Sequence, residues 1–93
     1  MRTVEVTLEG RVQRVGMRNF VRRLAEKHRI TGYVENLDDG SVRIVARGDE
    51  TELALFLRKV KKGSLAVKLS GGKITRIIEQ SSQELEFRGF EKR

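Results

Sequence analysis

Residues 3–29, TVEVTLEGRVQRVGMRNFVRRLAEKHR, change their hydrophobic period once, and this change decides the fold. From 3 to 9, apolar and polar residues alternate, which predicts a strand with one buried face. From 18 to 29, the apolar residues fall instead on one stripe of a helix. We therefore expect a strand and a helix joined by a loop that starts at Gly10.

The middle of the chain continues with short, alternating elements. Strands are predicted at 33–36 and 42–46, joined by a turn that contains the Asp39-Gly40 pair. A second helix is expected to begin after Asp49, which is placed as its N-cap, and to end at the Gly63-Ser64 pair.

The last third of the chain has weaker patterns. We expect 65–73 to be an elongated loop or hairpin, apolar residues at 74–78 to form a fourth strand, and those at 85–90 a short last one. The order β-α-β-β-α-β, with a small extra strand, is typical of an α+β, ferredoxin-like sandwich. This fold would have an antiparallel sheet of four to five strands with two helices on one face, in a single domain covering 1–93.

The composition excludes several kinds of site. The chain has no cysteine and one histidine, His28, so disulfides and thiol catalysis are excluded and a metal site has little material. The formal net charge is +7, which predicts anionic partners: phosphorylated metabolites, nucleic acid or acidic lipid. The first residues do not resemble a signal peptide, and no apolar run approaches the roughly 20 residues of a membrane span. We therefore expect a cytoplasmic protein with no membrane partner.

The loop before the first helix is the candidate site. A loop that feeds a helix N-terminus presents free main-chain N–H groups, which together with the helix dipole attract anions. Gly10 and Gly16 allow tight turns and close approach to a ligand. Arg18 opposes the dipole by about 0.3–1 kcal/mol unless an anion is bound. On the residues alone, a phosphate-binding loop and an ordinary glycine-containing turn with solvated arginines both stay open.

Two motifs give the chain a family resemblance. The loop resembles the acylphosphatase signature, in which an aliphatic residue and any residue precede Gly-x-Val-Gln-Gly-Val-x-Phe/Met-Arg. The residues that fit are Leu8, Gly10, Val12, Gln13, Val15, Met17 and Arg18. A second family signature, Gly-aromatic-Val-x-Asn with three further spaced positions, is matched by Gly32, Tyr33, Val34, Asn36, Gly40, Val42 and Gly48. Two motifs in the correct order and spacing are more specific than either one alone.

The resemblance implies an enzyme that hydrolyses acyl phosphates to a carboxylate and inorganic phosphate, with no metal and no organic cofactor. Arg18 would bind the phosphoryl group and Asn36 would position the attacking water. The phosphate-binding loop would consist of Arg11, Val12, Gln13, Arg14, Val15, Gly16 and Met17. The partners would be a small acyl phosphate and inorganic phosphate, with no nucleic acid, and the protein would be a monomer. Strand parity places Glu35 on the face opposite Asn36, outside the site.

Arg14 departs from the family pattern, which usually has glycine at this position. If the loop requires positive φ there, arginine costs about 1–2 kcal/mol. We therefore predict slower turnover than in an Arg14→Gly variant, with phosphate affinity kept. An anion-binding domain with weakened or lost catalysis is the corresponding alternative.

Two further alternatives come from other classes of protein. RNA-binding modules share this broad fold but carry exposed aromatic residues on the central strands, and the predicted strands 3–9 and 42–46 have none. An acylphosphatase-like module also opens the hydrogenase-maturation carbamoyltransferases. A free-standing enzyme is the simpler expectation.

The remaining candidates have structural explanations. His28 is expected to make a contact near the end of the first helix, and Asp38 and Asp39 are expected to form a turn rather than a metal site. The cluster of Lys59, Lys61 and Lys62 is predicted to be a solvated helix end. The aromatic residues Phe56, Phe87 and Phe90 are predicted to be core residues.

Overall fold

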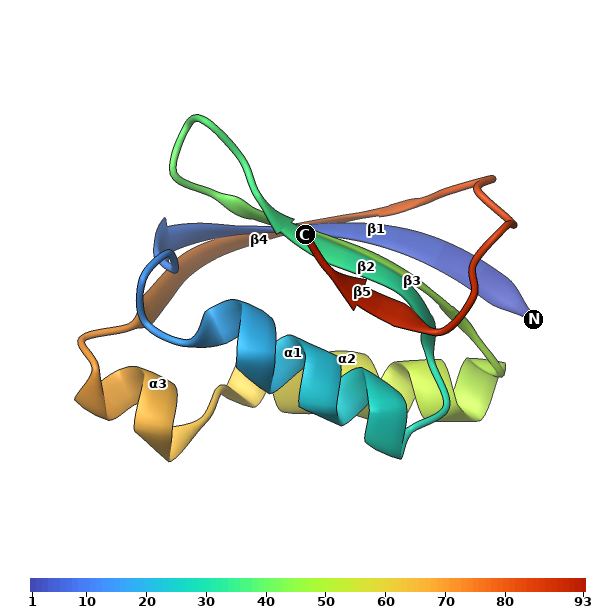
Figure 1. The fold of residues 1–93 in the computed structure, drawn as a ribbon, viewed down its shortest axis with the longest axis horizontal. Coiled ribbons are helices and arrows are strands. Elements are labelled where there is room, and N and C mark those ends of the chain that lie inside the picture. The colour runs from blue at the N-terminus through green and yellow to red at the C-terminus, as the bar shows by residue number, and fades with distance from the viewer.

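The computed structural model describes residues 1–93, and Figure 1 shows one sheet with the helices on one of its faces. The elements are β1 (Arg2–Arg11), α1 (Met17–Lys27), β2 (Thr31–Asn36), β3 (Val42–Gly48), α2 (Glu50–Lys62), α3 (Leu65–Leu69), β4 (Lys73–Ser81) and β5 (Phe90–Lys92). The strand order across the sheet is β4-β1-β3-β2-β5. The expected ferredoxin-like fold is thus confirmed, with β5 added beside β2.

Strand β1 lies between β3 and β4 and shows the alternation that its sequence predicts. Val4, Val6 and Leu8 are fully buried in the core between the sheet and the helices. On the opposite, open face of the sheet, the Glu5 carboxylate lies 3.3 Å from the guanidinium of Arg43. The period of two therefore separates a packed face from a charged one.

Helices α1 and α2 cover the packed face. Val21 and Ala25 of α1 are fully buried against it, as are Phe56 and Val60 of α2. Helix α2 begins directly after Asp49, as predicted, although the Asp49 side chain accepts no capping hydrogen bond. None of the helices combines the length and the apolar composition that crossing a membrane requires.

Helix α3 lies where a loop or hairpin was predicted, so that prediction is wrong. The hydroxyl of Ser64 caps the helix by accepting a hydrogen bond from the Val67 N–H at 3.2 Å. Val67 is the only buried residue of the helix, and one inward residue in five gives no helical period to read. Leu65 and Leu69 remain 74% and 79% exposed.

Strand β5 pairs with β2 in parallel, so the sheet is mixed rather than wholly antiparallel. Phe90 packs against the core, as predicted. Phe87 does not join the core, because the chain returns from β4 to the far edge of β2 by way of the open face. It lies instead over Tyr33 with ring centroids 6.2 Å apart, so its prediction as a core residue is wrong.

Candidate active site

The connection between β1 and α1 leaves its main-chain N–H groups without partners. No N–H of residues 12–16 donates a hydrogen bond to another group of the protein, and the first helical bond runs from Phe20 N–H to the Gly16 carbonyl at 3.1 Å. The N–H groups of 17–19 are the free donors of a helix N-terminus. Arg14 and Gly16 have positive φ, at 61° and 81°. A run of free donors at the positive end of a helix suits an anion.

Side chains of the loop hold it in place. Val12 and Val15 are buried in the core. The Gln13 amide donates hydrogen bonds to the main-chain carbonyls of Leu37, at 2.7 Å, and Ser41, at 2.9 Å. The loop is thereby fixed to both the core and the turn between β2 and β3.

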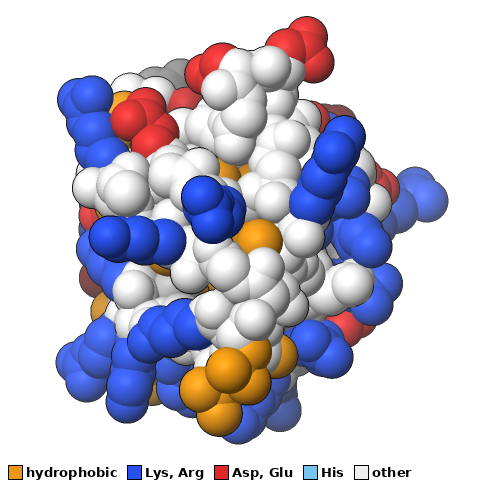
Figure 2. All heavy atoms as spheres, turned by 90° about the vertical axis from the view of Figure 1, so that its left-hand side faces the viewer, with side chains coloured by type: hydrophobic (Ala, Val, Ile, Leu, Met, Phe, Trp, Pro, Cys, Tyr) orange, Lys and Arg blue, Asp and Glu red, His pale blue; other side chains and the backbone are white.

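A small cavity beside this loop, of about 150 Å³, brings Arg18 and Asn36 together. The other lining residues are Val12, Arg14, Gly16, Met17, Asn19 and Lys92. None of the eight lining residues is acidic, and three of them, Arg14, Arg18 and Lys92, are cationic. Figure 2 shows the end of the molecule that carries the loop, where Lys and Arg side chains outnumber Asp and Glu. The cavity thus has the size and the charge for a small anion.

Asn36 ends β2 with its side chain on the packed face of the sheet. Val34, two residues earlier, belongs to the core, and Glu35 points to the open face, where it lies 3.7 Å from Arg43. The side-chain Oδ1 of Asn36 is buried and has no hydrogen-bond partner. A buried acceptor without a partner is costly, and a water or a ligand in the adjacent cavity can supply the missing donor.

Arg18 lies in the first turn of α1 and reaches toward the end of the chain. Its Nη1 donates a hydrogen bond to the main-chain oxygen of Arg93 at 2.7 Å. The Arg93 N–H in turn donates to the Val34 carbonyl at 2.8 Å, which holds this segment beside β2. A guanidinium has five N–H donors, so Arg18 keeps others available for a ligand.

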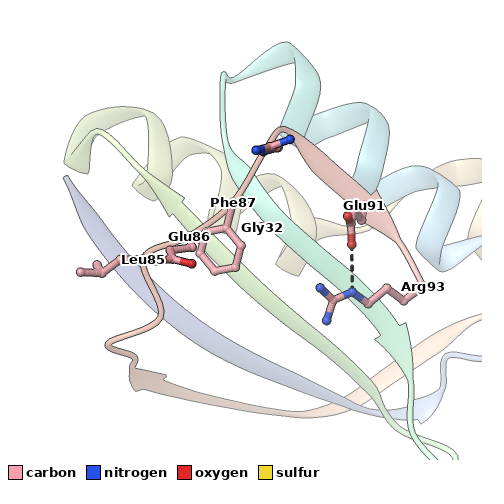
Figure 3. A pocket seen from close by; sticks show the side chains of 7 residues that line it. Gly32, Leu85, Glu86, Phe87, Glu91 and Arg93 are labelled. Atoms are coloured by element: carbon pink, nitrogen blue, oxygen red, sulfur yellow. Dashed lines mark hydrogen bonds and ion pairs between the residues drawn. The ribbon is translucent and has the colours of Figure 1, made fainter.

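A larger hollow of about 510 Å³ lies at the edge of β5, and Figure 3 shows its lining. There the guanidinium of Arg93 forms an ion pair with the Glu91 carboxylate at 3.0 Å and stacks 3.7 Å from the centre of the Tyr33 ring. The Arg93 cation is already paired, and the lining holds one further cation, Arg88, and one further carboxylate, Glu86. The smaller cavity, with no carboxylate, is therefore the better anion site.

Comparisons with known proteins show which family the chain belongs to. The family model Acylphosphatase matches residues 4–92. The chain belongs to the acylphosphatase family. It is 42% identical over 87 residues to the acylphosphatase of Bacillus licheniformis, an alignment that covers 94% of this chain and 89% of the relative.

Solved structures of the acylphosphatase family share the fold. The crystal structure of acylphosphatase from Bacillus subtilis matches with a TM-score of 0.85 and 40% identity, and covers 97% of this chain and 96% of that one. The crystal structure of full-length HypF, in its phosphate- and nucleotide-bound form, matches with a TM-score of 0.85 and 27% identity. That match covers 98% of this chain and 11% of HypF, so the acylphosphatase fold also occurs within a far longer chain.

Two arginines of the loop between β1 and α1 lie in different places: Arg14 lines the cavity with Arg18, and Arg11 does not. Arg14 has the left-handed backbone, φ 61°, that the missing glycine implied. The Arg11 side chain does not line the cavity with Arg18 and lies instead beside Gly71, in a separate hollow with Lys73.

Asn19 and Lys92 line the cavity but carry no motif in the sequence. For Lys92 a signal exists, because it lies two residues after the core residue Phe90 and so shares its face of the sheet. Using that signal requires knowing that β5 pairs with β2. Asn19 has no comparable signal, since polar residues are common in a first helical turn.

The remaining candidates lie outside the cavity. His28 is buried between α1 and α2, with Nδ1 2.7 Å from the Glu52 carboxylate and Nε2 3.0 Å from Lys59 Nζ. Asp39 forms the predicted turn and accepts a hydrogen bond from the Ser41 N–H at 2.9 Å. Hydrogen bonds from Ser41 lower the pKa of the Asp39 carboxyl.

Proposed function

We propose that this member of the acylphosphatase family hydrolyses the carboxyl–phosphate bond of acyl phosphates, giving a carboxylate and inorganic phosphate without a metal or organic cofactor. The observation that carries the proposal is that one cavity is lined both by hydrogen-bond donors and by a hydrogen-bond acceptor that have no partner in the protein. The free N–H groups of the loop and Arg18 supply donors for phosphoryl oxygens, and the unpartnered Asn36 Oδ1 supplies an acceptor for water.

Each group has a defined part in the reaction. The N–H groups of the loop and the Arg18 guanidinium bind the phosphoryl oxygens and stabilise their charge in a loose transition state. Asn36 Oδ1 accepts a hydrogen bond from a water and aims it at phosphorus. An amide is no base, so the proton of the water passes to a phosphoryl oxygen or to solvent. The carboxylate leaves without a strong general acid.

Lys92 adds a further cation to this site. It projects from β5 on the same face as Phe90 and lines the cavity with Arg18 and Asn36. The flexible ammonium of Lys92 suits the acyl oxygens of the substrate, whereas the fixed pair of donors in the Arg18 guanidinium suits the oxygens of the phosphoryl group. We expect Lys92→Met to raise KM several-fold and to change kcat little.

The test is hydrolysis of benzoyl phosphate, measured with and without a chelator. We expect turnover that the chelator does not change and that Arg18→Ala abolishes. Arg18→Lys keeps the charge and removes the fork, so it should recover little of the activity. Turnover that depends on a metal, or full activity in Arg18→Ala, would overturn the proposal.

One observation favours a second candidate, an anion-binding domain with weak or no catalysis. Arg14 holds positive φ without being glycine, and this strain can misaim the neighbouring N–H groups. Measurable phosphate binding without turnover would support this candidate. Binding of RNA that weakens with salt would instead support a nucleic-acid module. We expect neither, and we expect a monomer that acts in the cytoplasm.

A further inference from the structure

The chain carries an unbroken basic segment that the proposed reaction does not use. Between Leu53 and Ile78 every charged residue is basic. These residues are Arg58, Lys59, Lys61, Lys62, Lys68, Lys73 and Arg76. The fold gathers the end of α2, all of α3 and the start of β4 at one end of the molecule, beside the phosphate-binding loop (Figure 1).

Two large apolar side chains project from the middle of this basic surface. Leu65 and Leu69 are four residues apart, so they lie on one side of α3, and they are 74% and 79% exposed. Val67 points the other way, into the core. Figure 2 shows a hydrophobic patch at the lower edge of this end of the molecule, with Lys and Arg side chains around it.

Basic hollows lie on both sides of Lys73. The first, of about 410 Å³, is lined by Lys61, Lys62 and Lys68 as well as Lys73. The second, of about 560 Å³, is lined by Lys73 and Arg11 together with Thr75 and two glycines. Neither hollow has an acidic residue in its lining, so both are suited to anionic groups.

We propose that the α3 patch, formed by Leu65, Leu69, Lys62, Lys68 and Lys73, binds the surface of a bilayer that contains anionic lipids. Its two leucines enter the interfacial layer, and its lysines bind lipid phosphates. Exposed leucines ringed by cations are the pattern of a surface-binding segment, whose strength combines buried apolar area with attraction to anionic headgroups. Such binding departs from the expectation of no membrane partner, which rested on the absence of an apolar run long enough to span a membrane.

Other occupants fit the α3 patch less well. A second copy of the chain in a symmetric dimer would bring the same lysines against one another, because both copies use one patch. A nucleic acid would satisfy the lysines but would leave Leu65 and Leu69 without a role. Single-stranded nucleic acid is usually bound with aromatic stacking, and the patch has no aromatic residue.

The test is co-sedimentation with vesicles of phosphatidylcholine, with and without phosphatidylglycerol. We expect binding only to the anionic vesicles, and weaker binding as salt is raised. The double variant Lys68→Glu/Lys73→Glu should lose about tenfold or more in partitioning. The double variant Arg23→Glu/Lys27→Glu changes the net charge equally at exposed sites of α1 and should bind nearly as the parent does.

The leucines need a test of their own, at unchanged charge. Leu65→Ser/Leu69→Ser should lower partitioning about tenfold, whereas Leu85→Ser, at a 62% exposed leucine outside the patch, should not. The chain has no tryptophan, so Leu69→Trp gives a single reporter whose emission should shift to shorter wavelength on anionic vesicles. Absence of binding, equal loss in the patch and control variants, or binding only to RNA or to a second copy would each overturn the proposal.

Discussion

The turn between β2 and β3 and the loop between β1 and α1 differ in how their main-chain polar groups are hydrogen-bonded. The turn between β2 and β3 satisfies its own groups: Leu37 N–H donates to the Ser41 carbonyl at 2.9 Å, and Gly40 N–H donates to the Leu37 carbonyl at 3.1 Å. The loop of residues 12–16 donates none of its N–H groups to the protein. The turn satisfies its own polar groups, whereas the loop leaves N–H donors that a bound anion can satisfy.

The difference shows how the molecule keeps an unsatisfied loop in shape. Side-chain contacts with the rest of the protein hold the loop in place: Val12 and Val15 are buried in the core, and Gln13 makes two hydrogen bonds. Because the two Gln13 bonds end on Leu37 and Ser41, the hydrogen-bonded turn between β2 and β3 supports the loop of residues 12–16. Four substitutions test this relation.

Asn36→Ala removes the side-chain amide that lines the cavity between the loop and the start of the turn. We expect kcat for benzoyl phosphate to fall about 100-fold or more, because the water loses its positioning acceptor. Inorganic phosphate should bind as in the parent, since the donors of the loop remain. Retained activity, or a larger loss in Asn19→Ala on the other wall of the cavity, would place the water elsewhere.

Gln13→Ala cuts the link between the loop and the turn. It leaves the carbonyls of Leu37 and Ser41 without these donors, so we expect urea unfolding to show a loss of about 1–3 kcal/mol. The kcat should fall about tenfold as the loop loosens. Gln80→Ala is the matched control, because Gln80 also donates through its amide, to Glu5 at 2.6 Å, but at an exposed site. Equal effects of the two variants would contradict the link.

Arg14→Gly relieves the strain inside the open loop. Removing a side chain from positive φ should stabilise the protein by about 1 kcal/mol and raise kcat several-fold. Arg29 has nearly the same backbone, φ 56°, just after α1 and outside the cavity. Arg29→Gly should therefore give a similar gain in stability with no change in kcat. Identical turnover in the parent and in Arg14→Gly would refute the role of the strain.

Asp39→Asn has the smallest expected effect and acts on the closed turn alone. Hydrogen bonds from Ser41 lower the pKa of Asp39 in the folded protein, so its contribution to stability is complete above about pH 4. The contribution is lost as the pH falls through that lowered pKa. The variant should therefore lose less stability on acidification than the parent, measured by urea unfolding between neutral pH and acid. Asp38→Asn, which removes no hydrogen bond to Ser41, should follow the parent.

The sequence patterns predicted the sheet and the two long helices well, because their side chains alternate in burial with regular periods. They predicted no α3, since a five-residue helix with one buried side chain has no period. They also missed the parallel pairing of β5, because a three-residue strand identifies neither its partner nor its direction.

For the candidate site, the two motifs placed Arg18 and Asn36, and the structure puts both beside one cavity. The position of Lys92 followed from no motif, because it depends on which edge of the sheet the last strand joins. The strain at Arg14 could be anticipated, because arginine stands where the family usually has glycine, and the loop still requires positive φ at that position.

The shortness of β5 affects how the cavity behaves over time. Lys92 and the main-chain oxygen that accepts the Arg18 hydrogen bond both belong to the β5 segment. This segment has three residues paired with β2, hydrogen bonds to β2 at Gly89 and Arg93, and Phe90 packed against the core. A short edge strand opens more readily than the central strands of a sheet, so we expect the amide hydrogens of β5 to exchange before those of β1 and β3. Each such opening removes one wall of the cavity while the loop and Asn36 stay in place. We therefore expect substrate to enter the cavity and phosphate to leave it through local opening of this edge strand, without motion of the helices.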